Sequence, residues 1–208
     1  GHTEIVRHLL RAKPDVSYVD NVGRRALHYA AELGSADIVK QILNGGSPVN
    51  VTDHSGTTAL HIATEAGHVN LVTLLIHEGA NINRPKTYVS GETPFHVACR
   101  TGRYEIIKFM ASRGANVNSP TTEKIYPLHL AARGRHEKVV GLLCDLGANI
   151  DERNDAGKTA LMVAAEIGAA SVVSILIENH ADADLVDFHK RTALHNLSAI
   201  QPATQGHE

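Results

Sequence analysis

Pairs of aliphatic residues recur along this chain, each followed one helical turn later by a second apolar step. The pairs are Ile38-Val39, Leu71-Val72, Ile106-Ile107, Val139-Val140 and Val172-Val173, and the later steps include Ile42-Leu43 and Leu75-Ile76. Residues four apart lie on one face of an α-helix, so each set predicts a short helix with one buried face. Glycines before and after most of these sets indicate where the helices begin and end.

Upstream of each predicted helix lies another recurring segment, of which Thr58-Ala59-Leu60-His61-Ile62-Ala63 is typical. Its equivalents begin at Arg25, Thr93, Tyr126, Thr159 and Thr192, so successive copies are 33, 35, 33, 33 and 33 residues apart. The Thr hydroxyl is placed to cap a helix, and the His three residues later is placed to return a hydrogen bond. A fixed period of this size indicates stacked supersecondary units and not a single globular core.

These segments resemble the ankyrin repeat, and the resemblance covers nearly the whole chain. It implies an all-α repeat solenoid in which each unit is a helix-turn-helix with a β-hairpin finger. We expect a single domain over 1–208, with full repeats at 21–53, 54–88, 89–121, 122–154 and 155–187, and partial repeats at 1–20 and 188–208. The first repeat begins midway, and Gly206-His207-Glu208 looks like the entrance to a further helix. We therefore expect the chain to be part of a longer protein.

The composition favours an intracellular module, cytoplasmic or nuclear. The formal net charge of −2 gives no reason to expect nucleic acid or an anionic membrane as a partner. No apolar run approaches the roughly 18 residues of a membrane span, so we expect no direct membrane contact. The two cysteines, Cys99 and Cys144, are expected to be small buried hydrophobic residues without a disulfide. We expect the chain to be monomeric as a fragment.

The 14 histidines raise the question of a metal site. Repeat register accounts for eight of them: His28, His61, His96, His129 and His195 in the first segment, and His2, His68 and His136 near the mid-repeat Gly. Equivalent positions in stacked helices are about 8–10 Å apart, whereas zinc–nitrogen bonds are about 2 Å long. Phosphate-binding loops, nucleophile elbows and zinc-protease motifs are also absent from the sequence. We predict a protein that is not an enzyme and has no cofactor, metal or catalytic residue.

The resemblance implies that a protein or peptide partner binds the concave side, formed by the first helices and the fingers. The residue after each signature His is predicted to form an exposed apolar strip of Tyr29, Ile62, Val97, Leu130 and Val163. Beside it runs a charged column of Glu32, Glu65, Arg100, Arg133 and Glu166. We predict a partner-binding groove on these residues, centred on the third to fifth repeats. The other interpretation is that the strip is packed between helices and fingers and the charges are merely solvated.

The third repeat is two residues longer than the others, within Arg84-Pro85-Lys86-Thr87-Tyr88-Val89. Tyr88 is therefore a further predicted partner-binding residue, since an exposed Tyr beside basic groups is a frequent interface anchor. A tolerated loop insertion is the equally weighted alternative.

Two further functions stay open for the chain. One is regulatory binding of a small polyanion, a nucleotide or inositol phosphate, by Arg84, Lys86, Arg100, Lys124 and Arg133. The other is an architectural spacer within a larger enzyme or channel. Asn50, Asn83 and Asn118 occupy the position that asparaginyl hydroxylases modify in some ankyrin proteins, although a framework role is favoured.

Departures from the repeat pattern predict local strain. Arg135 and His180 stand where other repeats have Gly, so a left-handed backbone is expected at both, and Gly134 is placed to relieve the first. Lys124 likewise replaces the turn Gly of its finger. Because Met162 replaces the signature His, we predict that the C-terminal end frays first.

Overall fold

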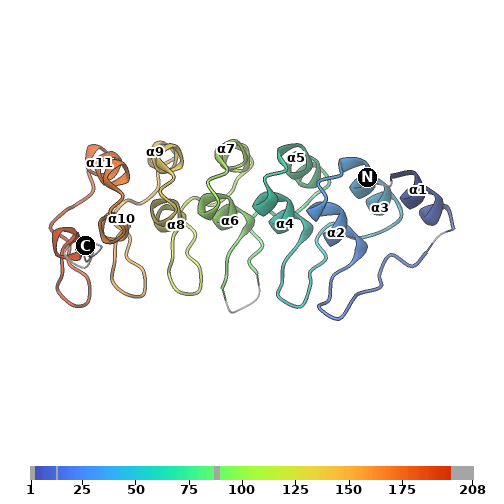
Figure 1. Cartoon of the computed structure of the whole chain (residues 1–208), viewed down its shortest axis with the longest axis horizontal. Coiled ribbons are helices and arrows are strands. Elements are labelled where there is room, and N and C mark those ends of the chain that lie inside the picture. The colour runs from blue at the N-terminus through green and yellow to red at the C-terminus, as the bar shows by residue number, and fades with distance from the viewer. Residues whose placement is uncertain (1–2, 13, 87–89, 198–208) are drawn as a thin grey trace, which may run out of the picture. The chain divides into compact units, whose positions relative to one another are not determined.

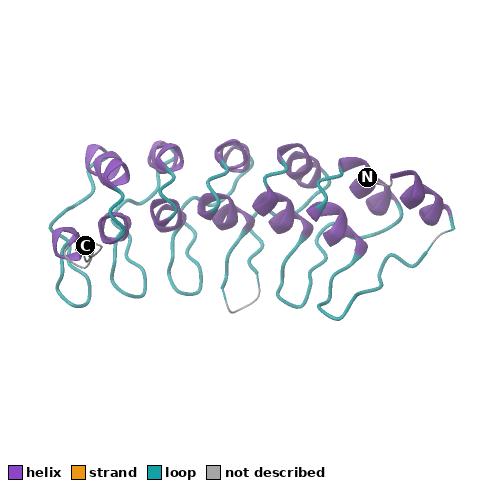
Figure 2. Ribbon diagram, in the orientation of Figure 1, coloured by secondary structure: helices purple, strands orange, loops and turns teal. Residues whose placement is uncertain are grey.

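The computed structural model describes residues 3–12, 14–86 and 90–197. The chain forms two compact units. Unit 1 comprises Gly1–Ala98 and Glu105–Ala115, and unit 2 comprises Cys99–Tyr104 and Asn116–Glu208. All regular secondary structure in the described ranges is helical, as predicted (Figure 2).

Unit 1 is built from helices in two rows, with loops on the side of the first helices (Figure 1). It contains α1 (Thr3–Arg11), α2 (Ala26–Glu32), α3 (Ala36–Asn44), α4 (Ala59–Ala66) and α5 (Val69–His77), with most of α6 (Pro94–Arg100) and α7 (Tyr104–Ser112). Within a repeat, α2 packs on α3 and α4 on α5. Between repeats, α2 packs along α4, and α3 packs along both α1 and α5.

Unit 2 repeats this arrangement. Its helices are α8 (Pro127–Arg133), α9 (Glu137–Asp145), α10 (Ala160–Glu166), α11 (Ala170–Glu178) and α12 (Ala193–Leu197). The pairs are α8 with α9 and α10 with α11, and the first helix α10 packs between α8 and α12. The recurring aliphatic pairs supply the buried faces in both units, since Val39, Val72, Ile107 and Val140 have no exposed surface.

The predicted Thr–His exchange at the start of the first helices is confirmed. The Thr58 hydroxyl accepts from the His61 backbone N–H at 3.4 Å, and the Thr58 N–H donates to His61 Nδ1 at 3.2 Å. Thr93 and His96 make the same pair of bonds. Thr159 caps Met162 N–H at 3.3 Å, but a methionine cannot return the bond.

The fingers are loops, whereas β-hairpins were expected. In the described residues the only β-bridge joins Thr52 and Thr58. In most fingers, a side chain at the base of the loop accepts hydrogen bonds from backbone N–H groups of the same loop and so closes it. Asp53 Oδ1, for example, accepts from the N–H groups of Ser55 and Thr57 at 2.9 and 2.8 Å. Asp20, Asn154 and Asp187 act in the same way. Each finger also keeps one backbone bond across its base, such as that from Asp53 N–H to the Thr57 carbonyl at 3.0 Å, but no strand ladder forms in the described residues.

Among the described residues, four other than Gly have a left-handed backbone: Lys124, Arg135, His180 and Lys190, with φ of 51°, 57°, 67° and 59°. The expectation for Arg135 and His180 is confirmed. The expected relief by Gly134 is wrong, because Gly134 keeps a right-handed φ of −75° as the cap of α8. The left-handed residue is instead the next one, Arg135, at the position where other repeats have Gly.

Candidate functional site

Tyr29 is the most prominent of the predicted contacts in unit 1, with 46% of its surface exposed. Its hydroxyl donates to Asp20, and the Arg24 guanidinium lies 5.8 Å from its ring centroid. Arg24 also pairs with Glu32 at 3.2 Å. The hydrogen bond to Asp20 is the main cause that raises the pKa of Tyr29. The aromatic ring is therefore held in place, as an interface anchor requires.

The neighbouring helix α4 presents the next pair of predicted residues. Ile62 is partly exposed and Glu65 is exposed. Because α2 packs along α4, these two residues and Tyr29 lie on adjacent first helices of one unit.

The predicted exposed strip does not continue beyond Ile62. Val97, Leu130 and Val163 have exposed fractions of 0%, 8% and 1%, so the expectation that they are exposed is wrong. Val163 lies on α10, which packs between the first helices α8 and α12. Leu130 lies on α8, which packs against α10. A side chain enclosed in this way offers no area to a partner. The packing interpretation is correct for these three positions.

The residues of the charged column differ in their exposure and in their ion pairing. In unit 2, Glu166 is partly exposed and pairs with Lys158 at 2.7 Å. Arg133 is exposed and forms no ion pair within the part of the chain that the structure describes. Arg100 is partly exposed, and its carbonyl accepts from His136 Nε2 at 2.9 Å.

A shallow hollow of about 940 Å³ lies among three successive fingers of unit 1. It is lined by Asn21, Val22, Arg24, Asp53, His54, Ser55, Thr57, Lys86 and Ser90. The first two fingers are joined by the His54 N–H, which donates to the Val22 carbonyl at 3.0 Å. The sequence pattern did not reveal this hollow, because the repeat period says nothing about how loops fold.

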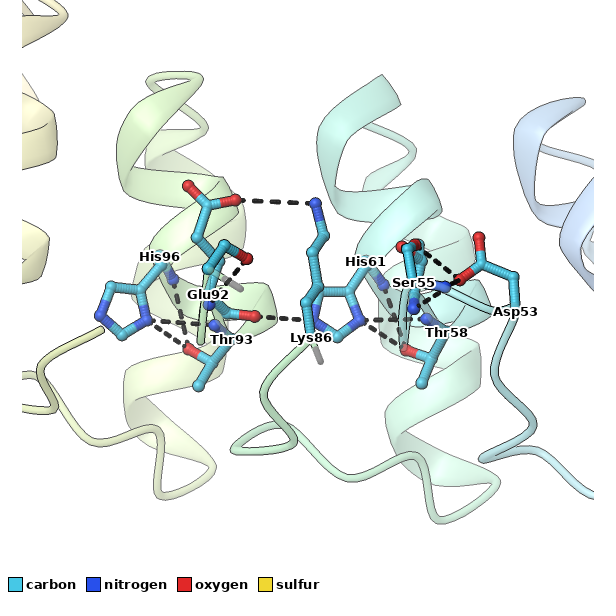
Figure 3. Close-up of polar contacts among 10 residues, drawn as sticks. Asp53, Ser55, Thr58, His61, Lys86, Glu92, Thr93 and His96 are labelled. Atoms are coloured by element: carbon cyan, nitrogen blue, oxygen red, sulfur yellow. Dashed lines mark hydrogen bonds and ion pairs between the residues drawn. The ribbon is translucent and has the colours of Figure 1, made fainter. Parts of the chain in front are cut away.

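The third finger contributes Lys86, whose ammonium lies 3.6 Å from the Glu92 carboxylate. Figure 3 shows Lys86 extended beside His61 toward Glu92. The Lys86 N–H donates to the Glu92 carbonyl at 2.8 Å and closes the finger. Tyr88, the predicted anchor of this finger, lies outside the described residues.

The signature histidines link successive repeats, a role that the sequence reasoning missed. The second ring nitrogen, Nε2, of His28, His61 and His129 donates to the carbonyls of Thr57, Glu92 and Lys158 at 3.1, 3.1 and 2.8 Å. Burial lowers the pKa of all three, and that of His61 falls to about 4. The rings are therefore neutral near pH 7 and serve the framework.

The finger asparagines also have framework partners. Asn50, Asn83 and Asn118 donate from Nδ2 to the carbonyls of Gly79, Gly114 and Gly147 at 3.0, 3.1 and 3.1 Å. The Oδ1 of Asn50 accepts from Asn81 N–H at 2.8 Å. Each side chain joins two repeats, which supports the framework interpretation over modification.

The basic residues of the polyanion hypothesis do not form one cluster within either unit. Arg84 and Lys86 belong to unit 1, whereas Arg100, Lys124 and Arg133 belong to unit 2. Lys124 faces Asp155 at 3.9 Å, and Lys86 faces Glu92. Among the described residues, no group of three or more His, Cys, Asp or Glu is arranged to hold a metal ion. No helix in these ranges has the length and apolar character needed to cross a membrane.

Comparison with known proteins identifies the repeat. A family model described as "Ankyrin repeats (3 copies)" matches residues 1–86, 36–121, 84–154 and 128–201. No curated protein matches the chain. The overlapping matches agree with the all-α repeat fold described above.

Proposed function

The chain belongs to the ankyrin-repeat family, and on that premise we propose that it is a non-catalytic scaffold that binds a protein or peptide partner. Ankyrin repeats are generally protein-interaction modules. Fold alone does not choose a ligand, so the proposal depends on the surface that this chain exposes.

The proposed binding surface consists of Tyr29, Glu32, Ile62 and Glu65 on α2 and α4, together with the finger hollow. Arg24 connects the two parts, because it lines the hollow and lies over the Tyr29 ring. The main support is that Tyr29, an aromatic residue held by a hydrogen bond to Asp20, lies beside the finger hollow of about 940 Å³. The groove is thus centred on the second to fourth repeats, one repeat earlier than the sequence predicts.

The surface of unit 2 contributes less to the proposal. Leu130 is buried, and Glu166 is neutralised by Lys158. A partner charge would have to compete with this pair, in which the Lys158 side chain is only 16% exposed. Arg100 and Arg133 are retained as proposed contacts because each still presents a cationic side chain.

Selection of displayed random peptides on the chain tests the proposal. We expect enriched sequences whose binding weakens about tenfold in an Ile62→Asp variant, a loss on the order of 1.4 kcal/mol. The matched control is Thr73→Asp on α5, a partly exposed position of a second helix. Circular dichroism establishes that both variants are folded.

Two results would speak against the proposal. If no peptide is enriched, the architectural-spacer function gains support. If both substitutions weaken binding equally, the contact lies elsewhere on the surface.

A further inference from the structure

We infer that the finger hollow of unit 1 recognises an acidic side chain of the partner, with Lys86 and Arg24 as the specificity-determining residues. This inference depends on the proposed peptide-binding function and adds the chemistry of the peptide. The third finger differs from the other five in the residue at its base.

The base of each finger normally carries a side chain that accepts hydrogen bonds from its own loop. Asp20, Asp53, Asn154 and Asp187 do so with Oδ1, and Thr121 Oγ1 accepts from Ile125 N–H at 3.0 Å. The equivalent position of the third finger is Lys86, which has no acceptor. The Ser90 hydroxyl takes over by accepting from Glu92 N–H at 3.4 Å. Backbone and Ser90 hydrogen bonds therefore close the loop in place of a side-chain acceptor at Lys86, and Lys86 is among the residues that line the hollow.

The charges that line the hollow favour an anion. Its lining contains two permanent cations, Arg24 and Lys86, and a single carboxylate, Asp53. Asp53 Oδ1 already accepts from Ser55 N–H, Ser55 Oγ and Thr57 N–H. The Ser90 hydroxyl adds a neutral donor, whereas the Ser55 hydroxyl donates to Asp53 and also contacts the Thr57 hydroxyl. A carboxylate entering here meets more donors than acceptors.

Arg24 and Lys86 each form an ion pair, but neither side chain is fully buried. Arg24 pairs with Glu32 and Lys86 with Glu92, and neither glutamate is among the residues that line the hollow. The side chains of Arg24 and Lys86 retain exposed fractions of 32% and 19%. Their partners thus fix the position of the cationic groups while leaving part of each side chain accessible. Preorganised donors of this kind reduce the ordering cost of binding.

A peptide explains the shape of the hollow better than a free anion does. Residues of three successive fingers line it and it is open to solvent, so we expect an extended segment to be able to contact all three. Val22 at its edge is 54% exposed and provides an apolar contact for a neighbouring side chain.

The test uses peptides selected from a random displayed library on the full chain. We expect enrichment of Asp and Glu, and binding that weakens as ionic strength rises. Replacing the acidic residues of a selected peptide by their amides should weaken binding about tenfold, and so should Lys86→Gln. The two changes together should cost little more than either alone, because they remove the same contact. The control is Lys40→Gln on α3, an exposed lysine of a second helix.

Each alternative outcome overturns a distinct statement. Neutral or basic selected peptides, or amide peptides that bind as tightly as acidic ones, contradict the inference while the proposed function stands. Failure to select any peptide contradicts both. Inorganic phosphate that displaces the peptide at low concentration, in a Lys86-dependent manner and beyond a chloride control of equal ionic strength, identifies a free anion as the ligand and overturns the peptide assignment.

Discussion

Individual residues decide where this repeat array departs from regularity. His180 occupies a left-handed position that Gly46, Gly79, Gly114 and Gly147 hold in other repeats. The side chain is exposed, so the position retains a strained backbone with no burial to offset it. Such departures fall mainly in two repeats: the fifth carries Lys124, Arg135 and Asp151, and the sixth carries Met162 and His180.

We expect His180→Gly to stabilise the chain by about 1 kcal/mol, since Gly adopts the left-handed conformation without steric cost. Gly147→Ala is the matched control. Its φ is 81° and an added Cβ would meet no atom within 4 Å, so the substitution should destabilise by a similar amount through backbone strain alone. Urea denaturation measures both. A His180→Gly variant less stable than the parent chain would contradict the strain argument.

The finger asparagine is replaced by Asp151 in the fifth repeat. Asp151 Oδ1 accepts from Asp182 N–H at 3.0 Å, as Asn118 does from Asn149, but an ionised carboxylate cannot donate to the next carbonyl. We expect Asp151→Asn to restore that donor and stabilise by about 1 kcal/mol. The reciprocal Asn118→Asp should destabilise, because the Gly147 carbonyl loses its donor. Equal stabilities by thermal unfolding would show that these links contribute nothing.

At the scale of the element, neutral histidines near the start of the first helices α2, α4 and α8 join successive repeats. His61 accepts from Thr58 N–H and donates to the Glu92 carbonyl, which fixes the proton on Nε2. A second proton would occupy Nδ1 and remove the acceptor. The same geometry at His28 and His129 makes this a property of the repeat.

The free energy of unfolding should therefore fall as pH decreases from about 6.5 toward 4. Burial lowers the folded-state pKa of His61 to about 4, below its unfolded value of 6.5, so the unfolded chain binds more protons in this window. The stabilisation is fully present above pH 6.5, and for His61 alone it amounts to about 3 kcal/mol. Denaturant titrations at pH 7 and pH 5 measure the difference. Stability that rises on acidification would contradict the neutral-histidine account.

Sequence reasoning predicted the helices well because period and helix face are local properties. The capping Thr and the paired aliphatic residues act within one or two turns, so Thr58 and Val72 were placed correctly. The exposure of Val97 and Leu130 was misjudged because it depends on neighbouring elements. The finger hollow depends on loop conformation, which the period does not specify. The unusual Lys86 was visible in the sequence as a cation among Asp, Asn and Thr at equivalent positions.

At the scale of the whole molecule, linkages between repeats weaken toward the C-terminus. Met162 cannot bridge to the next finger as His129 does, and Leu194 on the short helix α12 is 74% exposed. We expect amide hydrogen exchange to be faster in α12 than in α8, because α12 is short and, among the described helices, packs mainly on the first helix α10. Mass-spectrometric exchange at peptide resolution measures this. Equal protection of the two helices would contradict the prediction.

The central claim is that a partner binds the first helices and fingers of unit 1. Hydrogen exchange of the chain with and without a selected peptide tests it most directly. We expect added protection in residues 20–24 and 53–66, with no change in the second helices α3 and α5. Protection confined to α3 and α5, or none anywhere despite saturation, would contradict the claim.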